Sequence, residues 1–265
     1  MSIAVISMIR NEAERYLESA LDVWREFADE IIVYEDWSMD STRGMLLSAG
    51  CKVVNPVQTK PAWGNEVAPR KALWQAALES KCDWLFWLDA DMIPAGDPRD
   101  LQARDADAIS FRLFDLWDWR ALMYRADGRW QAHNNPRIWM IRNPTRQHDD
   151  WIWHDRGIHC GHTPINYVPS RVLLAPLEYS ILHYGYAAER DRAAKADQYA
   201  GQETQMSPDE ILHARSISDE TYITFPLPFK PLWQLEHLRE RESLLGHVCD
   251  NSKLSSTPTI VLSKV

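Results

Sequence analysis

The first ninety residues alternate short apolar runs with amphipathic stretches at helical spacing. Buried strands are predicted at residues 3–8, 30–34, 52–55 and 84–88. Helices are predicted between them, at 12–27, 41–50 and 70–80. Strands that are apolar on both faces and separated by helices indicate a mostly parallel sheet covered on both sides. The expected fold class is therefore α/β, with a Rossmann-like first half.

The pattern changes from residue 107 onward. A strand is predicted at 108–113, and short segments rich in Trp, Arg, His and Asp follow it without a helical period. Helices are expected again at 187–199 and around 232–245. The end of the chain has the composition of a loosely held tail. We therefore expect two halves of one domain and a tail, at 1–105, 106–249 and 250–265.

Composition narrows the class of protein. The chain has 265 residues, 45% hydrophobic and 25% charged, without an apolar run long enough to cross a membrane. Its first residues lack an export signal and its four Cys form no CxxC pair, so a cytoplasmic protein with reduced thiols is expected. The net charge of −9 disfavours a broad nucleic-acid-binding face and leaves only a local basic groove for such a partner.

Tryptophan and glycine usage are both unusual. The chain has thirteen Trp but only ten Gly, and neither GxGxxG nor GxxxxGK[ST] occurs, which argues against a glycine-rich phosphate cradle. Ten of the Trp lie between residues 63 and 153. That region has either an aromatic-rich core or flat aromatic surfaces for a ligand with apolar faces.

Polar residues follow three of the predicted strands, where ligands of parallel sheets bind. Asn11 and Glu12 follow the first strand, Glu35 and Asp36 the second, and Asp89 and Asp91 the fourth. An Asp-x-Asp at a strand terminus suits a divalent cation that bridges the phosphates of a nucleotide. The triplet also occurs by chance, but carboxylates straight after a buried strand are costly unless solvated, paired or metal-bound.

Four strings, VISMIRNEAERYL, ADEIIVYEDWSMDST, APRKALWQAA and CDWLFWLDADM, stand in this order in the first 95 residues. They resemble the nucleotide-binding half of family 2 glycosyltransferases of the GT-A fold. A looser likeness extends to LHYGYAAERDRAAKADQY at 182–199. The resemblance implies a GT-A type sheet and an inverting hexosyl transfer from a nucleotide-diphosphate sugar, with Mn²⁺ or Mg²⁺ as cofactor. A UDP-sugar is the preferred donor on the same ground.

The resemblance also implies roles for single residues. Asp36 is expected at the nucleotide base, and Arg70 near the base or the diphosphate. Asp89 and Asp91 are expected at the ribose and the metal, with His183 either a third metal ligand or a structural histidine. The other donor-site candidates lie at strand ends or on the predicted 187–199 helix: Arg10, Asn11, Glu12, Glu35, Ala90, Arg192 and Lys195. The basic residues of that helix alternatively form a solvated face.

Two departures from the family pattern are visible. Glu35 stands where the family usually has Asp, and Trp37 where it often has Gly. The sequence also lacks a QxxRW motif, which argues against a processive polysaccharide synthase.

The second half should hold the acceptor site and the general base of an inverting transferase. Asp155 and Asp150, in the His-rich segment 147–162, are the candidate bases. A zinc site is the rival interpretation of that segment, although its spacings match no standard zinc signature. Sugar rings have apolar C–H faces, so Trp117, Trp119, Trp151 and Trp153 are candidate acceptor platforms, with core packing as the alternative.

The leading hypothesis is thus a metal-dependent glycosyltransferase acting on a glycan, lipid-linked, protein or modified-nucleobase hydroxyl. Two alternatives use the same residues differently. A haloacid-dehalogenase-like phosphatase also has Asp-x-Asp after a strand, but its aspartates lie near the chain start and are followed by Thr or Val, whereas Met92 follows here. An inactive GT-A scaffold would instead bind glycans through its Trp residues.

Overall fold

The computed structural model describes residues 1–54, 65–101, 103, 105–144, 150–155 and 161–237. A seven-stranded sheet has the order β10-β6-β9-β4-β1-β2-β3, and its neighbours are parallel except that β9 is antiparallel to both β4 and β6. Its strands are β1 (Ile3–Ile9), β2 (Glu30–Glu35), β3 (Lys52–Val53), β4 (Trp84–Trp87), β6 (Ala108–Phe111), β9 (Arg137–Arg142) and β10 (Val172–Leu174). The α/β fold class with a mostly parallel central sheet is confirmed.

Three helices connect the first four strands of this sheet. They are α1 (Leu17–Phe27), α2 (Thr42–Ser48) and α3 (Val67–Leu78). The apolar stripe of α1, which includes Leu17, Trp24 and Phe27, is buried, and α3 packs against β1 and β2. Helix α1 begins at Leu17 rather than at residue 12, and before it the N–H of Arg15 donates to the carbonyl of Glu12 at 3.1 Å in a separate turn.

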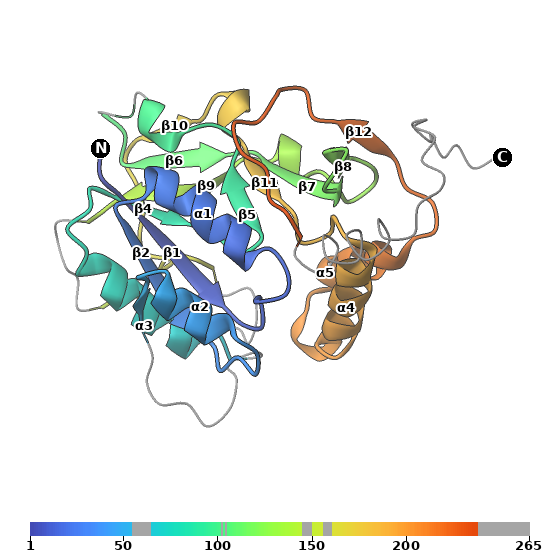
Figure 1. The fold of residues 1–265 in the computed structure, drawn as a ribbon, viewed down its shortest axis with the longest axis horizontal. Coiled ribbons are helices and arrows are strands. Elements are labelled where there is room, and N and C mark those ends of the chain that lie inside the picture. The colour runs from blue at the N-terminus through green and yellow to red at the C-terminus, as the bar shows by residue number, and fades with distance from the viewer. Residues whose placement is uncertain (55–64, 102, 104, 145–149, 156–160, 238–265) are drawn as a thin grey trace, which may run out of the picture.

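A second sheet has the order β12-β8-β7-β11-β5. Its strands are β5 (Met92–Pro94), β7 (Leu113–Asp118), β8 (Met123–Arg125), β11 (Ile181–His183) and β12 (Thr224–Pro226). Helices α4 (Glu189–Ala200) and α5 (Pro208–Arg215) contact each other beside it. Figure 1 shows β1, β2 and β4 with their helices on one side of the molecule and β7, β8, β12, α4 and α5 on the other.

The second half is more regular than its sequence suggests. Strand β9 and helix α5 lie where no element was expected, and the expected strand 108–113 ends at Phe111 before β7 begins at Leu113. Residues 232–237 are not helical, and the rest of the predicted 232–245 helix, like the tail, lies outside the described residues. Short 3-10 turns complete the fold at Pro98–Asp100, Ala132–Asn134, Leu177–Tyr179, Glu203–Gln205 and Ser216–Ser218. No helix in the described part of the chain is long and apolar enough to span a bilayer.

A small aromatic cluster, Trp117, Trp130, Tyr186 and Ile217, is buried beside the second sheet. The guanidinium carbon of Arg125 lies 4.8 Å from the ring centre of Trp117 and 5.0 Å from that of Trp130. Arg125 is 2% exposed and donates to the carbonyl of Ser216 at 2.7 Å and to the carboxylate of Asp219 at 2.8 Å. One buried cation therefore connects β8 to the segment after α5.

Replacing Arg125 should destabilise this half. In Arg125→Ala, the Ser216 carbonyl and two carboxylates lose their donor and the aromatic rings face a cavity, so we expect the free energy of unfolding to fall by about 3–5 kcal/mol. Chemical denaturation measures the change. Arg129→Ala, at an exposed position of the same segment, is the control and should change stability by less than about 0.5 kcal/mol. Equal stabilities of the two variants would contradict this account of the cluster.

Candidate functional site

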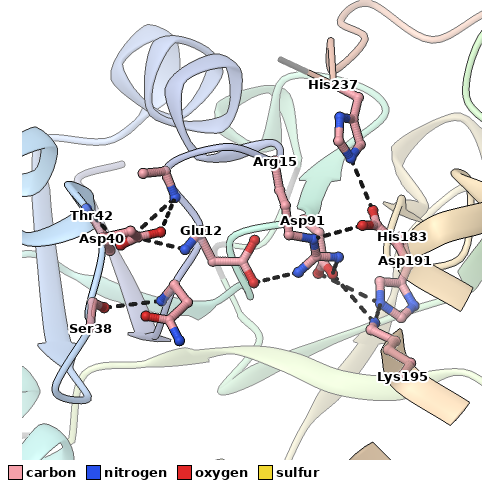
Figure 2. Close-up of polar contacts among 12 residues, drawn as sticks. Glu12, Arg15, Ser38, Asp40, Thr42, Asp91, His183, Asp191, Lys195 and His237 are labelled. Atoms are coloured by element: carbon pink, nitrogen blue, oxygen red, sulfur yellow. Dashed lines mark hydrogen bonds and ion pairs between the residues drawn. The ribbon is translucent and has the colours of Figure 1, made fainter. Parts of the chain in front are cut away.

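Hydrogen bonds at the carboxyl ends of β1 and β2 join the segment after β1 to the loop after β2 and to the first residue of α2. The N–H groups of Glu12 and Ala13 donate to Oγ1 of Thr42 at 2.8 and 3.0 Å. The N–H of Asn11 donates to Oγ of Ser38 at 3.0 Å (Figure 2). Asn11 has a positive φ of 53°, a conformation that Asn tolerates better than most residues. These bonds hold the segments that follow β1 and β2 together.

Glu35 and Asp36 end β2 in different environments. The carboxylate of Glu35 accepts the N–H of Ser38 at 2.5 Å and pairs with Arg43 at 3.1 Å. Glu35 therefore shapes the turn after β2 and is already engaged. Asp36 is 2% exposed, and its N–H donates to the carbonyl of Ile9 at 2.8 Å, which places it at the carboxyl edge of the sheet.

Strand pairing in the second sheet brings Asp91, His183 and Asp115 together. Asp91 immediately precedes β5. His183, the last residue of β11, lies opposite Met92 of β5 on one side and opposite Asp115 of β7 on the other. Nδ1 of His183 lies 2.7 Å from Oδ1 of Asp115, and Nε2 lies 3.6 Å from Oδ1 of Asp91. The carboxylate of Asp115 accepts a hydrogen bond from Nδ1 of His183, which orients the imidazole so that Nε2 faces Asp91.

Two basic side chains approach the same carboxylate of Asp91. Nζ of Lys195, on α4, lies 3.4 Å from Oδ2 of Asp91, and Nη2 of Arg15 lies 3.6 Å from it (Figure 2). Burial opposes ionisation of Asp91, but Lys195, His183 and Arg15 together hold its pKa below the usual value. Asp91 is therefore a buried anion among cations and a histidine.

Gly185 lines the space between these groups. A Cβ atom at this position would lie 2.0 Å from Nζ of Lys195, 2.5 Å from Oδ2 of Asp91 and 2.6 Å from Nε2 of His183. No side chain larger than hydrogen fits there without displacing them. The glycine thus keeps the polar centre open.

A chain of ion pairs leads from this centre towards the C-terminal segment. Arg15 also contacts Glu12 at 2.5 Å and Asp191 at 3.2 Å, and Asp191 lies 3.2 Å from Nε2 of the fully buried His237 (Figure 2). Burial raises the pKa of Glu12 to about 8, although Arg15 opposes the shift. Segments that are far apart in the sequence therefore meet behind Asp91.

Asp89 and Arg70 lie beside this centre, at the end of β4 and on α3. Burial raises the pKa of Asp89, and the positive charge of Arg70 counteracts the rise. The Arg70 side chain is 10% exposed and approaches Glu66 only at 3.9 Å. Ala90 is buried between the two aspartates of the motif, and Nε of Arg10 is buried without a hydrogen-bond partner among the described residues.

Two residues predicted for the donor and acceptor sites, Arg192 and Trp117, lie against or in the aromatic cluster instead. Arg192 donates to the carbonyls of Trp117 and Tyr186, at 3.1 and 2.6 Å, so it supports the aromatic cluster rather than pointing to a diphosphate. Trp117 is 5% exposed and is covered by Arg125 and Arg192, whose guanidinium carbons lie 4.8 and 5.0 Å from its ring centre. The expectation of an open stacking face therefore fails for Trp117.

The loop at 150–155 packs over helix α3. Trp151 and Trp153 lie edge-on to Trp74, with ring centres 5.2 and 6.3 Å apart, and Trp153 is 9% exposed. Trp153 is thus a core residue, whereas Trp151 and Trp119 are partly exposed. The candidate bases Asp150 and Asp155 are exposed, and neither carboxylate pairs with another described residue.

The residues of the zinc interpretation are His154, His159, Cys160 and His162. Of these, His159 and Cys160 lie outside the described part of the chain. Within that part, His154 is exposed and His162 packs against Trp139 with ring centres 4.7 Å apart. No group of three or more His, Cys, Asp or Glu that could hold a metal is found among the described residues.

Sequence reasoning missed the residues that surround Asp91: Arg15, Asp115, Gly185, Asp191 and His237. Arg15, Gly185 and Asp191 stand inside the strings used for the resemblance, but their pairing depends on contacts between distant segments. In the sequence, Asp115 is one of several charged residues interleaved with Trp residues. Only the register of β7 and β11 identifies it as the partner of His183.

No protein-family model matches the sequence, and none of the curated proteins matches it. Solved structures of glycosyltransferases show partial likeness. Glucosyl-3-phosphoglycerate synthase from Mycobacterium tuberculosis, in complex with Mn²⁺, UDP and phosphoglyceric acid, is 22% identical over 43% of this chain and 43% of that one, with a TM-score of 0.30. S. aureus TarS in complex with UDP is 11% identical over 82% of this chain and 69% of that one, with a TM-score of 0.49.

Mannosyl-3-phosphoglycerate synthase from Rubrobacter xylanophilus is 18% identical over 43% of this chain and 40% of that one, with a TM-score of 0.29. The chain therefore spans less than half the length of each of the two phosphoglycerate-linked synthases it matches. All three TM-scores are below 0.5 and all three identities are below 25%. The functional argument accordingly rests on the side chains of the site.

Proposed function

We propose that the protein is a glycosyltransferase that transfers a sugar from a nucleotide-diphosphate sugar to an acceptor hydroxyl with the help of a divalent cation. The observation behind this proposal is the polar centre formed by Asp91, His183 and Gly185. Asp89 and Arg70 lie beside it, and Asp36 lies at the carboxyl edge of the parallel strands. This is the edge where α/β sheets bind nucleotides.

The residues present fit a divalent cation. Asp91 and His183 offer an oxygen and a nitrogen ligand, Asp115 orients the imidazole as metal-bound histidines require, and Gly185 places no side chain of its own beside them. Two protein ligands leave positions for diphosphate oxygens and water, which suits Mg²⁺ or Mn²⁺. The cation would neutralise negative charge on the leaving diphosphate.

The other residues take roles around the donor. Asp36 would accept the N–H edge of the base, Asp89 would bind the ribose, and Arg70 would contact the base or diphosphate. In the reaction, the acceptor oxygen attacks the anomeric carbon as the bond to the diphosphate breaks, and a carboxylate takes the acceptor proton. Asp155 and Asp150 remain the candidate bases, with Trp119 and Trp151 as partly exposed acceptor contacts.

The phosphatase alternative has less support from the sequence. Its aspartates lie near the chain start and are followed by Thr or Val, whereas Asp91 follows three β-α elements and precedes Met92. A glycan-binding scaffold would not need the buried charges behind Asp91, which cost free energy unless they serve a ligand or are fully paired.

A thermal-shift screen tests the proposal. UDP-, GDP- and dTDP-sugars are each added to the protein with and without Mn²⁺. We expect one nucleotide sugar to raise the melting temperature of the protein only when Mn²⁺ is present, and we expect it to be the UDP-sugar. No stabilisation by any nucleotide with Mn²⁺ would contradict the proposal, and NMR of the sugar product would establish whether the anomeric configuration inverts.

Removing the orienting carboxylate should weaken cation binding. In Asp115→Asn, the amide no longer fixes the proton on Nδ1 of His183, so we expect Mn²⁺ affinity in the presence of nucleotide to fall by about 10–100-fold. Calorimetry measures the affinity. Asp118→Asn, on the exposed end of the same strand, is the control and should bind Mn²⁺ as the wild type does.

A further inference from the structure

Lys195 occupies the position between the two candidate metal ligands. Its Nζ lies 3.4 Å from Oδ2 of Asp91 and 3.3 Å from Nε2 of His183. Both atoms are ones that a divalent cation would use. The ammonium group thus bridges the oxygen and nitrogen donors from the same side as the Gly185 opening, where a Cβ would lie 2.0 Å from Nζ.

The surroundings hold the ammonium group in this place. Its Nζ lies 4.4 Å from the ring centre of Tyr186, a distance typical of a cation–π contact. Tyr186 is buried and stands edge-on to His183, with ring centres 5.1 Å apart. Lys195 is therefore seated among three side chains of the centre rather than lying along the surface of α4.

The positions of a divalent cation and of this ammonium group exclude each other. A cation bound to both Asp91 and His183 would take the lone pairs that Lys195 now contacts, and like charges repel strongly at such distances in a buried site. Arg15 already places a second positive charge 3.6 Å from Asp91. Lys195 must move before a divalent ion can occupy the site.

We propose that Lys195 is an internal competitor of the divalent cation, holding Asp91 and His183 in place until a metal-nucleotide complex displaces its ammonium group. The inference rests on the proposed function, because it concerns the same cation site. Since a ligand's apparent affinity falls with the fraction of protein in the competent state, free Mn²⁺ should bind weakly to the wild type. The anionic nucleotide would favour displacement by giving the lysine another partner.

Direct measurement of Mn²⁺ binding, without any assay of turnover, tests the competition. Electron paramagnetic resonance follows the loss of the free Mn²⁺ signal for the wild type and for Lys195→Met, which keeps an unbranched side chain one atom shorter and removes its charge. Without nucleotide, we expect Lys195→Met to bind Mn²⁺ about tenfold more tightly or better, with a smaller further gain on adding UDP. Lys81→Met, at an exposed position, should behave as the wild type does.

The possible outcomes separate the two proposals. Equal or weaker Mn²⁺ binding by Lys195→Met, in a protein whose wild type binds Mn²⁺ with nucleotide, overturns the competition and leaves the proposed function intact. Absence of Mn²⁺ binding in every protein, even with UDP, GDP or dTDP, overturns both.

The wild type provides a second test that does not depend on a folded variant. Lysine acylation followed by mass spectrometry should show Lys195 labelled faster at saturating Mn²⁺ without nucleotide than in the absence of Mn²⁺, with Lys81 as the internal reference. Equal labelling of Lys195 under both conditions would overturn the competition.

Discussion

Asp91→Asn should abolish sugar transfer and leave the protein folded. The amide keeps the size of the side chain but removes the charge that faces His183, Lys195 and Arg15. It is also a poorer ligand for a hard cation. We expect turnover of the nucleotide sugar to fall by about three orders of magnitude, because stabilisation of the leaving diphosphate is lost. Release of nucleoside diphosphate measures this effect.

The same variant should lose some stability. Lys195 and Arg15 each lose an anionic partner, although Arg15 keeps Glu12 and Asp191, so we expect the free energy of unfolding to fall by about 1–3 kcal/mol. Asp22→Asn, on an exposed turn of α1 with 71% of the side chain accessible, is the matched control and should retain activity and stability. Wild-type turnover by Asp91→Asn would remove the aspartate from the mechanism.

Gly185→Ala should be nearly as damaging, although it adds a single methyl group. The new Cβ would overlap Nζ of Lys195 and lie within 2.6 Å of Asp91 and His183. Lysine can swing away, but the aspartate and histidine are fixed by their strands and by Asp115. We expect Mn²⁺ binding with nucleotide, measured by calorimetry, to weaken by about 100-fold or more, since the methyl group occupies the space of the cation.

Gly44→Ala is the control for that substitution. Gly44 lies in α2, and a Cβ there would meet no atom within 4 Å. Alanine is favoured over glycine in a helix, so this variant should gain up to about 1 kcal/mol in stability and keep wild-type binding. Similar metal affinities of the two alanine variants would contradict the role of Gly185 as the residue that keeps the centre open.

The sequence predicts the first half of the fold well, and the reason is local. Strands such as WLFWL are apolar on both faces, and α1 shows a clear helical stripe, so short-range patterns suffice to define them. Because the carboxyl ends of parallel strands share an edge, the polar residues that follow them are expected together. Asp89 and Asp91 do lie near each other after β4, and Asp36 follows β2 beside the last residue of β1.

The rest depends on contacts that a local pattern does not reveal. Strand β9 inserts antiparallel between β4 and β6, so its neighbours are distant in sequence and its own six residues carry no sign of the register. The same is true of Asp115, which becomes relevant only through pairing of β7 with β11. His237 approaches the site through tertiary packing against Tyr16, with ring centres 4.7 Å apart.

Tryptophan shows why composition alone does not assign function. Trp117 and Trp153 are buried, and Trp117 has Arg125 and Arg192 over its ring. An arginine next to an aromatic side chain in the sequence is compatible with both a ligand platform and a packed cation–π cluster. The structure assigns packing to these two residues, whereas Trp119 and Trp151 are partly exposed and stay predictions as acceptor contacts.

Calorimetric titration of the wild type with UDP, GDP and dTDP, each with and without Mn²⁺, tests the central claim most directly. The account predicts that one nucleoside diphosphate binds in the presence of Mn²⁺, that this binding weakens strongly when the metal is chelated, and that Asp91→Asn does not show it. Failure of all three nucleotides to bind with Mn²⁺, or binding that is equally tight without the metal and in Asp91→Asn, would contradict it.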